Sequence, residues 1–367
     1  MLHRTYSQKA QHILTFAQRL QGGGVERAML RMADGWIKAG RRVTLVLGSR
    51  EGPLASEIPA GIELHELGDG RHSALFSLAP HVGEMGPDLI FCPGNHYSGI
   101  AALARLRLGA DAPPIVAKVS NALVRPEQGP VTAWGYRRWL RLHPLFLDHV
   151  VAMTPAMAAE AVAEMRIPAH RVSVIANPPA TARADATPVA VPEGLYIIGV
   201  GRLEPQKRWD RLLAALPRLA DQRIKLLILG EGAARPSLEA QVAAMGLGDR
   251  VSMPGHAGDP LPALRGAAVA VLTSDYEGVP GVLREALLVG TPVVSTESSV
   301  AVREILASPD LGSVVGREDG DALVAALDHW LAPGRARPAP VIAGGDPIGE
   351  YLALFDSLVH AQTKSQP

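Results

Sequence analysis

The chain has 367 residues, 47% of them hydrophobic, with 36 basic and 36 acidic side chains and a single cysteine, Cys92. The length allows more than one hydrophobic core, so we expect two domains, and a net charge of zero argues against a nucleic-acid partner. One cysteine cannot form an internal disulfide, the apolar runs are far shorter than the roughly 20 residues of a membrane-spanning helix, and the N-terminus lacks a secretory signal pattern, so we expect a cytoplasmic protein.

The first predicted unit is a strand, a glycine-rich turn, a helix and a second strand. An apolar run at 13–17 leads to the glycines at 22–24, after which apolar side chains recur at positions 25, 28, 29, 32, 33, 36 and 37. This spacing places them on one face of a helix. Gly40 fits the C-cap of that helix, and the stretch 42–47 predicts the next strand. The unit is a βαβ.

Further short strands are predicted in the first half of the chain, at 89–92, 115–119, 149–152 and 172–175. Helical patterns separate them. This alternation favours a parallel sheet with helices on both faces.

The segment 178–193 is rich in Pro, Ala and Thr and has no amphipathic period, so we interpret it as a linker between domains. The alternation then resumes, with helices predicted at 209–219 and 236–245 and strands at 195–200, 224–230, 250–254, 268–273 and 292–295. We therefore expect two doubly wound α/β domains in tandem, with ligands bound in a cleft between the carboxyl ends of their strands.

Two glutamates flank a predicted helix start in the second domain, in the stretch SDYEGVPGVLREALLVGTPVV at 274–294. Pro280 suits the first helical position, and Gly278 and Gly281 leave backbone amides uncovered for an anion such as phosphate. If the helix begins at Pro280, Glu277 and Glu285 lie roughly 12 Å apart along its axis and about 80° apart around it. Carboxylates at both ends of a phosphate-binding turn suit a nucleotide sugar, although the helix dipole alone also favours a glutamate here.

A second polar cluster, GVGRLEPQK at 199–207, follows a predicted strand. Arg202 and Lys207 can bring two cations to one diphosphate, the arginine as a bidentate donor and the lysine as a point charge. We interpret Arg208 and Arg211 as solvated, and residues 275–276 as structural. A dinucleotide-binding fingerprint is disfavoured, because neither glycine pair, at 199 and 201 or at 22 and 24, has a third glycine at the required spacing.

These motifs resemble the retaining glycosyltransferases of family 4. The resemblance rests on GRLEPQK, VSMPGHAGDP and SDYEGVPGVLREALLVGTPVV, with further similar stretches in GGGVER, VSVIANPP and ESSVAVREIL, and it covers nearly the whole chain. It implies the GT-B fold, an α/β architecture of two Rossmann-like doubly wound parallel-sheet domains facing a cleft. On this basis residues 1–177 bind the acceptor, 178–193 link the domains, 194–345 bind the nucleotide-sugar donor, and a helix at 346–367 crosses back to the first domain.

The resemblance also implies roles for individual residues. Arg202 and Lys207 correspond to ligands of the donor diphosphate, Glu285 to a ligand of the ribose hydroxyls, and His256 to a residue near the base. The hydroxyls of the donor sugar are bound by Glu277 with the backbone of Gly278, Val279, Pro280 and Gly281, and the phosphates are approached by Gly22, Gly23 and Gly24.

The family usually works without a bound metal ion, and we expect neither a metal nor another cofactor here. The implied reaction is displacement on one face of the sugar, in which Glu277, Arg202 and Lys207 contribute orientation and charge stabilisation. One position departs from the family. Many members place a histidine at the end of a strand of the first domain, whereas this chain has Ser120 there. His96 is a candidate for the same space, although a single histidine is more often structural.

The first half of the chain contains a segment of mixed aromatic and basic character, WGYRRWLRLH at 134–143. Such a segment fits contact with an anionic membrane face or with a lipid-diphosphate acceptor. Alternatively, Trp139 and Leu142 belong to the core and the arginines form a solvated helix face.

The predicted function is transfer of a hexosyl unit from a nucleotide sugar, by expectation a UDP-sugar, to a glycan or glycolipid in envelope or exopolysaccharide biosynthesis. The enzyme is expected in the cytoplasm or at the inner face of the membrane. A sugar-nucleotide epimerase and a phosphorylase of the same architecture remain open as alternatives, although no lysine stands out for the pyridoxal phosphate of a phosphorylase. A non-catalytic nucleotide-sugar-binding protein is a third alternative, which only Ser120 favours.

Overall fold

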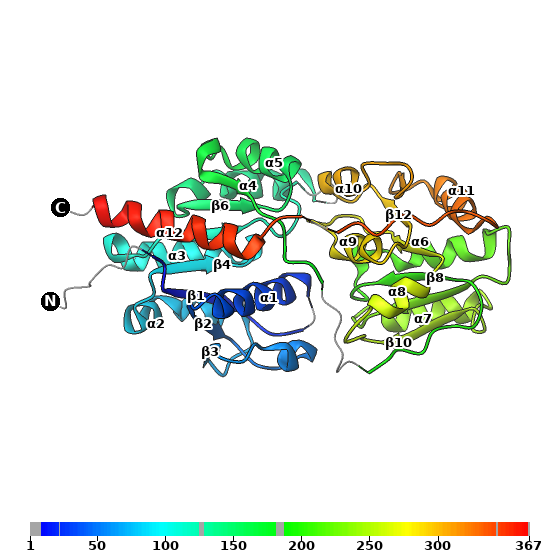
Figure 1. The fold of residues 1–367 in the computed structure, drawn as a ribbon, viewed down its shortest axis with the longest axis horizontal. Coiled ribbons are helices and arrows are strands. Elements are labelled where there is room, and N and C mark those ends of the chain that lie inside the picture. Colours follow the sequence, from blue (N-terminus) through cyan, green and yellow to red (C-terminus); the bar gives the residue numbers. More distant parts are fainter. Residues whose placement is uncertain (1–8, 22, 125–127, 181–186, 343, 366–367) are drawn as a thin grey trace. The chain divides into compact units, whose positions relative to one another are not determined.

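The computed structural model describes residues 9–21, 23–124, 128–180, 187–342 and 344–365. The chain forms two compact units (Figure 1). The first contains the described residues of 1–178 and 345–367, and the second contains those of 179–344. Each unit is built on one parallel sheet covered by helices. The predicted fold class, two doubly wound parallel-sheet domains, is confirmed.

The sheet of the first unit has the strand order β3-β2-β1-β4-β5-β6-β7. Its strands are β1 (His12–Ala17), β2 (Arg42–Leu47), β3 (Glu63–Glu66), β4 (Leu89–Cys92), β5 (Ile115–Lys118), β6 (His149–Ala152) and β7 (Val172–Val174). Every residue of β1, β4, β5 and β6 is buried, as expected for central strands covered on both faces.

The helices of this unit are α1 (Gly24–Lys38), α2 (Leu78–Met85), α3 (Ser98–Leu108), α4 (Pro130–Leu140), α5 (Pro155–Met165) and α12 (Pro347–Ser365). α1 buries the apolar face predicted from its periodicity, including Met29, Met32 and Trp36. Gly40 follows the C-cap residue Ala39 and has a φ of +82°, a left-handed conformation that favours glycine. β1, α1 and β2 thus form the predicted βαβ unit.

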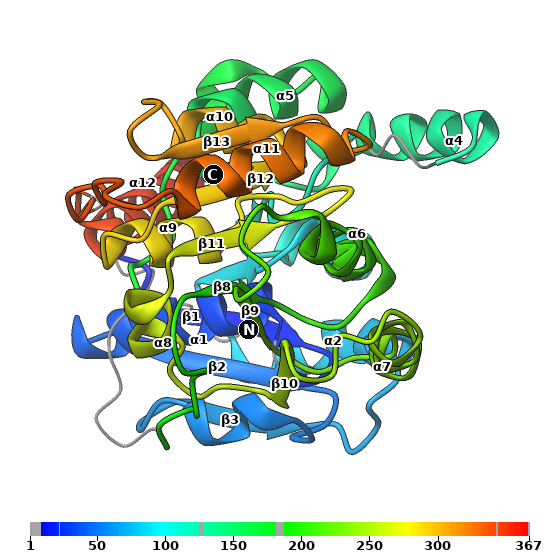
Figure 2. The same cartoon turned by 90° about the vertical axis from the view of Figure 1, so that its right-hand side faces the viewer.

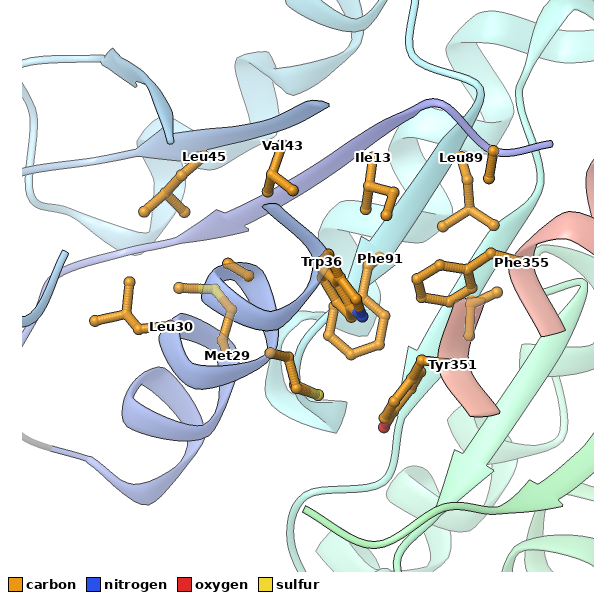
Figure 3. Packing of buried hydrophobic residues seen from close by; sticks show 14 of the residues in the cluster. Ile13, Met29, Leu30, Trp36, Val43, Leu45, Leu89, Phe91, Tyr351 and Phe355 are labelled. Carbon is orange, nitrogen blue, oxygen red and sulfur yellow. The ribbon is translucent and has the colours of Figure 1, made fainter. Parts of the chain in front are cut away.

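An aromatic cluster fills the core on one face of this sheet (Figure 3). Trp36 of α1, Phe91 of β4, and Tyr351 and Phe355 of α12 are fully buried. Their ring centroids lie 5.2 to 6.0 Å apart in tilted and edge-on pairs, the arrangement that aromatic rings prefer. Half of the cluster therefore comes from residues near the C-terminal end of the sequence.

Polar contacts fix α12 on the same unit. Asp356 accepts a hydrogen bond from the amide of Ala10 at 2.9 Å and an ion-pair bond from Arg41 at 2.8 Å. The side-chain amide of Gln362 donates to the carbonyl of Ala112 at 3.0 Å. The segment expected as a returning helix is therefore part of the first unit.

The second unit has a parallel sheet with the order β10-β9-β8-β11-β12-β13. Its strands are β8 (Tyr196–Val200), β9 (Lys225–Leu229), β10 (Val251–Gly255), β11 (Val269–Leu272), β12 (Val293–Thr296) and β13 (Gly312–Val315), and its helices are α6 (Trp209–Ala215), α7 (Arg235–Ala244), α8 (Leu261–Gly266), α9 (Gly281–Leu288), α10 (Val300–Ile305) and α11 (Gly320–Leu331). Successive residues of β9 alternate between two apolar clusters, Leu226 and Ile228 in one, Leu227 and Leu229 in the other. The sheet is thus covered on both faces. None of the helices in the described part of the chain combines the length and the apolar character needed to cross a bilayer.

The segment interpreted as a linker, 178–193, contains the boundary between the two units, which lies between Pro178 and Pro179. Ala180 and Val189 of this segment pack against the core of the second unit. Residues 181–186 lie outside the described residues.

A buried lysine stands at the end of β5. Lys118 is 1% exposed, and its ammonium group donates to Asn177 Oδ1 at 2.8 Å. Burial lowers the pKa of Lys118 from 10.5 to about 7, and the carboxylate of Glu26 has a smaller, opposite effect. A side chain enclosed to this degree is not accessible to a large cofactor.

Lys118→Met is expected to change the pH dependence of stability. Above pH 7 the unfolded chain keeps the lysine proton that the folded chain has lost, so the cost of burying this group is largest below pH 7 and falls as the pH rises toward 10.5. From pH 7 to pH 9 the free energy of unfolding of the wild type should therefore rise, relative to that of the variant, by up to about 3 kcal/mol. Urea denaturation at both pH values measures it.

The control for this experiment is Lys38→Met, which removes an exposed lysine. Lys38→Met should follow the wild type at both pH values. If Lys118→Met did so as well, a neutralised Lys118 would be excluded.

Phe355→Ala is expected to destabilise the first unit by about 3–5 kcal/mol, the usual cost of removing a buried aromatic side chain. Because Phe355 contacts Trp36 at 5.3 Å between ring centroids, denaturation followed by tryptophan fluorescence reports the loss. Ser357→Ala, at an exposed position of the same helix, is the matched control. Equal midpoints for the two variants would show that α12 is not part of this core.

Candidate functional site

The centre of the second sheet contains a topological switch point. β8 lies between β9 and β11, so the connection from β8 runs to one side of it and the later strands lie on the other. In open parallel sheets, ligands bind at such a point beyond the carboxyl ends of the strands. The loops that leave these ends are 201–208 after β8 and 273–280 after β11. Six of the predicted site residues lie in these two loops: Arg202, Lys207, Glu277, Gly278, Val279 and Pro280.

A partly buried ion pair joins the two loops. Lys207 Nζ lies 2.6 Å from Glu277 Oε1, and the two side chains are 14% and 12% exposed. The hydroxyl group of Ser274 donates to the same oxygen at 2.6 Å. The other carboxylate oxygen, Oε2, has no partner among the described residues. Glu277 thus has one oxygen held by two donors and one available to a ligand.

Other hydrogen bonds hold the loops together independently of this pair. The backbone carbonyl of Gln206 accepts a hydrogen bond from the amide of Asp275 at 2.9 Å. Its side-chain amide donates to the carbonyl of Tyr276 at 2.5 Å. Thr273 Oγ1 donates to the carbonyls of Lys207 and Arg208, at 3.0 and 2.9 Å. The loop after β11 is therefore bonded to the loop after β8 on both sides of Ser274.

Asp275 adds an ionic link between the same segments. Arg208 approaches its carboxylate to 3.3 Å and Arg211 to 2.7 Å, and Arg211 also pairs with Glu318. The interpretation of both arginines as solvated is therefore wrong, because they hold the loop after β11 in place. The opposite charges are visible in the sequence, but only the neighbouring positions of β8 and β11 bring them together.

Thr273 and Ser274 are site residues that sequence reasoning missed. A signal was present, because these hydroxyl side chains directly follow the buried strand β11 at the carboxyl edge of the sheet, where ligands bind. Their partners could not be predicted, since they lie on a segment far away in the chain.

Glycines make room for this arrangement. A Cβ atom at Gly199 would lie 2.5 Å from the ring of Trp209, and one at Gly230 would lie 2.0 Å from the carbonyl oxygen of Gly201. A Cβ atom at Gly201 would lie 3.3 Å from Lys207 Cε. The glycine pair after β8 therefore serves the close packing of α6 and Lys207, which accounts for its spacing without a dinucleotide fingerprint.

The helix after the second loop begins one residue later than predicted. α9 starts at Gly281, and Pro280 is its N-cap with extended backbone angles, φ −71° and ψ 104°. The fixed φ of proline suits either position, so the sequence did not distinguish them. The predicted distance between the two glutamates is therefore not applicable, because Glu277 lies in the loop and only the half-buried Glu285 lies on the helix as assumed.

The turn before α9 presents backbone amides. The amide of Glu277 donates to the carbonyl of Ser298 at 2.8 Å. In the part of the chain that the structure describes, the amides of Gly278, Val279 and Gly281 have no acceptor. Together with the N-terminus of α9, these amides can bind the oxygen atoms of an anionic ligand.

Arg202 and His256 lie in loops at the same edge of the sheet. Arg202 follows β8 and is exposed, and its guanidinium group bonds to none of the described residues. His256 follows β10 and is exposed. On the strand between them, Glu231 follows β9, and hydrogen bonds from Arg235 at 2.8 and 2.6 Å lower the pKa of its carboxyl group. Arg202 is thus the cation of this edge that is available to a ligand without breaking an ion pair.

The glycine loop of the first unit leads into α1. Gly23 is the N-cap of α1 in an extended conformation, and Gly24 is its first residue. A Cβ atom at Gly23 would lie 2.2 Å from the Glu26 carboxylate, so a larger residue would displace that side chain. Gly22, which was predicted to share their role, lies outside the described residues.

His96 and Ser120 are neighbours at the carboxyl ends of β4 and β5. A Cβ atom at Gly94 would lie 3.1 Å from the His96 ring and 2.6 Å from Ser120 Oγ. His96 is exposed, with its ring centroid 3.8 Å from that of Tyr97. Ser120 donates to Asn95 Oδ1 at 3.1 Å. The two residues considered for the histidine position of the family therefore lie in one small region.

Carboxylates at metal-binding spacing have structural partners. One Asp-x-Asp sequence occurs, at Asp319 and Asp321. Asp319 caps α11 by accepting from the amide of Ala322 at 2.8 Å, and Asp321 pairs with Arg218. Within the described ranges, no group of three or more His, Cys, Asp or Glu side chains is arranged to hold a metal ion.

Two family models match the chain. The model described as "Glycosyl transferase 4-like domain" matches residues 23–178, and the model described as "Glycosyl transferases group 1" matches residues 194–332. One model therefore falls on each of the two units, and together they cover most of the sequence.

Characterised relatives are similar over part of their length. The lipopolysaccharide core biosynthesis glycosyltransferase LpsE of Rhizobium meliloti is 28% identical over 52% of this chain and 56% of its own length. The 2-deoxystreptamine glucosyltransferase of Streptomyces kanamyceticus is 32% identical over 40% of this chain and 42% of its own. The chain thus spans about half the length of these relatives.

Solved structures share the fold over nearly the whole chain. HepE of Anabaena in complex with UDP-glucose matches with a TM-score of 0.69 and 19% identity, over 96% of this chain and 94% of that chain. The lipopolysaccharide outer core galactosyltransferase WaaB matches with a TM-score of 0.62 and 18% identity, over 96% and 98%. The similarity to these structures shows the fold, and the matches to the two family models show the family. The chain belongs to the glycosyltransferases of the family 4 type with the GT-B fold.

Proposed function

We propose that this protein is a retaining glycosyltransferase that moves a hexosyl unit from a nucleotide sugar to a glycan or lipid-linked acceptor. The observation that carries the proposal is the partly buried Lys207–Glu277 pair at the switch point of the second sheet. It brings a cation suited to a diphosphate and a carboxylate suited to sugar hydroxyls to one place, next to the amides of Gly278, Val279 and Gly281. A nucleotide sugar has the matching groups, because its diphosphate is directly bonded to a sugar with several hydroxyls.

The proposed donor is a UDP-sugar, and the proposed process is the assembly of an envelope or extracellular polysaccharide. HepE, which shares the fold, is described in complex with UDP-glucose. LpsE is named for lipopolysaccharide core biosynthesis, and a relative from Erwinia amylovora is named for amylovoran biosynthesis. These names support the process and the donor class, and the geometry of the site supports the reaction.

In the proposed reaction, the bond between the anomeric carbon and the diphosphate oxygen breaks, and the acceptor hydroxyl forms a bond to the same face of that carbon. The acceptor proton passes to an oxygen of the departing diphosphate. Lys207 and Arg202 stabilise the negative charge on the diphosphate, and Glu277 orients the sugar through its hydroxyls. Because two cationic side chains can supply this charge stabilisation, we propose that the enzyme needs no metal ion or other cofactor.

We assign the remaining predicted residues to binding and orientation. Glu285 on α9 binds the ribose hydroxyls, and His256 lies near the base. Gly23 and Gly24 allow the first turn of the first unit to approach the phosphates, and His96 contacts the donor sugar. Loss of any one of them is expected to weaken donor binding more than it weakens folding.

α4 presents an exposed face of mixed apolar and basic character. Val131 is 82% exposed and Trp134 62%, and the Arg138 guanidinium lies 5.2 Å from the centroid of the Trp134 ring. At about 100° per residue, these three positions, Arg141 and Leu142 fall within about 100° of the helix circumference. α4 lies at the right-hand edge of Figure 2, and its Arg137 lies 3.6 Å from Glu164 of α5. Leu142 is 47% exposed and therefore not part of the core, contrary to the alternative interpretation of this segment.

We propose that this face of α4 rests on the anionic inner surface of the membrane, where a lipid-linked acceptor is available. Apolar side chains on the outer face can enter the lipid interface, and the arginines among them can pair with lipid phosphates. The half-buried Trp139 donates to Ser98 Oγ at 3.2 Å and therefore faces the protein.

The donor proposal predicts stabilisation by one nucleoside diphosphate. UDP should raise the melting temperature of the wild type, whereas GDP, ADP and NAD should not, because only a ligand that binds the folded state shifts unfolding. Glu285→Ala should abolish the shift. Glu239→Ala, which removes an exposed carboxylate of α7, should retain it.

A shift with NAD alone would contradict this proposal and indicate a dinucleotide enzyme instead. Hydrolysis of the corresponding nucleotide sugar should also be detectable at a slow rate. Binding without any turnover, with or without an acceptor, would favour the non-catalytic alternative.

The membrane proposal predicts binding to liposomes that depends on anionic lipid and on α4. The wild type should float with vesicles containing anionic phospholipid and remain in solution with neutral vesicles, because the arginines supply the attraction. Replacing Arg137, Arg138 and Arg141 together with glutamine should abolish flotation. The same change at Arg218, Arg223 and Arg303, three exposed arginines of the second unit, should leave it intact; equal loss in both triple variants would argue against a specific surface on α4.

A further inference from the structure

The ammonium group of Lys207, which the proposed function assigns to the diphosphate, is already paired with a carboxylate. Lys207 Nζ donates to Glu277 Oε1 at 2.6 Å, and no other partner of this ammonium group is present among the described residues. A diphosphate that approaches Lys207 therefore also approaches the negative charge of Glu277. Because both side chains are largely buried, water screens this repulsion less than it would at the surface.

The pair is not needed to hold the two loops together. Thr273, Gln206 and Asp275 each bond the loop after β11 to the loop after β8. Four further hydrogen bonds and an ion pair therefore remain when the Lys207–Glu277 contact is removed. A carboxylate in this place needs another explanation than loop attachment.

The orientation of the carboxylate supplies that explanation. Lys207 and Ser274 both bond to Oε1 of Glu277, so Oε2 is left without a partner in the described part of the chain. A sugar hydroxyl can donate to Oε2 in a charge-assisted hydrogen bond, which is stronger than a neutral one. A bare nucleoside diphosphate has no group that can make this bond from the position of the sugar.

We propose that Glu277 is a specificity-determining residue that weakens the binding of the bare nucleoside diphosphate and thereby favours the intact nucleotide sugar. This inference rests on the proposed function, since it assumes that the diphosphate lies at Lys207. Repulsion between Glu277 and the phosphates acts on both ligands, but only the nucleotide sugar recovers it through hydrogen bonds to Oε2. Discrimination of this kind uses a repulsive element against the wrong ligand.

The same arrangement favours release of the product. Once the sugar has been transferred, its hydroxyls no longer occupy Oε2. When the diphosphate has then lost to solvent the proton that it received from the acceptor, it carries one more negative charge than it did in the nucleotide sugar. Glu277 is then a competitor for Lys207. The ion pair of the ligand-free site is thus the state to which the enzyme returns after each turnover.

Calorimetry on the wild type and four variants tests the inference. The probes are UDP and UDP-glucose or, if another nucleoside diphosphate stabilises the wild type in the thermal screen, that diphosphate and its glucosyl derivative. Glu277→Gln should bind the bare diphosphate about tenfold more tightly than the wild type does, because the repelling charge is gone while the shape is kept. Its affinity for the nucleotide sugar should be unchanged or lower, so the ratio of the two affinities should change by tenfold or more.

Matched variants separate charge from other effects. Glu277→Asp keeps the charge and should bind the bare diphosphate as weakly as the wild type does. Glu239→Gln removes a carboxylate outside the site and should bind both probes like the wild type. Glu277→Ala provides a second neutral side chain at position 277 in case Glu277→Gln does not fold.

The outcomes distinguish this inference from the proposed function. A wild type that binds the bare diphosphate, with neutral variants at position 277 that bind it equally or less tightly, would overturn the inference and leave the proposed function standing. A wild type that binds neither a nucleoside diphosphate nor its glucosyl derivative would overturn both.

Discussion

The hydrogen bonds between the loops after β8 and β11 are the constraint on which the candidate site depends. Sheet order makes the two loops neighbours, but it does not fix their conformations, since loops are the most variable parts of an α/β fold. Thr273, Gln206 and Asp275 remove this freedom by bonding one loop to the other. Lys207 and Glu277 are thereby brought within hydrogen-bonding distance by other residues, and their positions do not depend on their own attraction.

This division separates the scaffold of the site from its chemistry. If the ion pair alone held the loops together, any ligand that used its charges would also dismantle the site. Here a ligand can take over the ammonium group or the carboxylate while the surrounding bonds persist. Binding groups on a preorganised scaffold lose less entropy when the ligand arrives, which is why loops can carry function on a fold that is otherwise rigid.

The sequence was sufficient for most of the fold, because buried strands and amphipathic helices have distinct periods. It predicted two of the four edge strands, β7 and β10, and missed the other two, β3 and β13. β3 has the polar sequence ELHE, and β13 is only GSVV, so neither has the apolar run that marks a central strand. At the site, motifs identified Lys207 and Glu277 individually. Their contact, and the pairing of Asp275 with two arginines, could not be predicted, because it follows from the position of β8 beside β11 and no local pattern in the chain encodes sheet order.

The position of α12 has a consequence for how the protein is made. Tyr351 and Phe355 complete a core whose other aromatic residues, Trp36 and Phe91, leave the ribosome far earlier. Domains usually fold as units in the order of their synthesis, but here the first unit keeps an uncovered apolar surface until α12 emerges. The second unit is continuous in sequence, so its core can be completed before α12 is synthesised. The unit that is synthesised first is therefore completed last, and during this interval the nascent chain depends on chaperones or on rapid elongation to avoid aggregation.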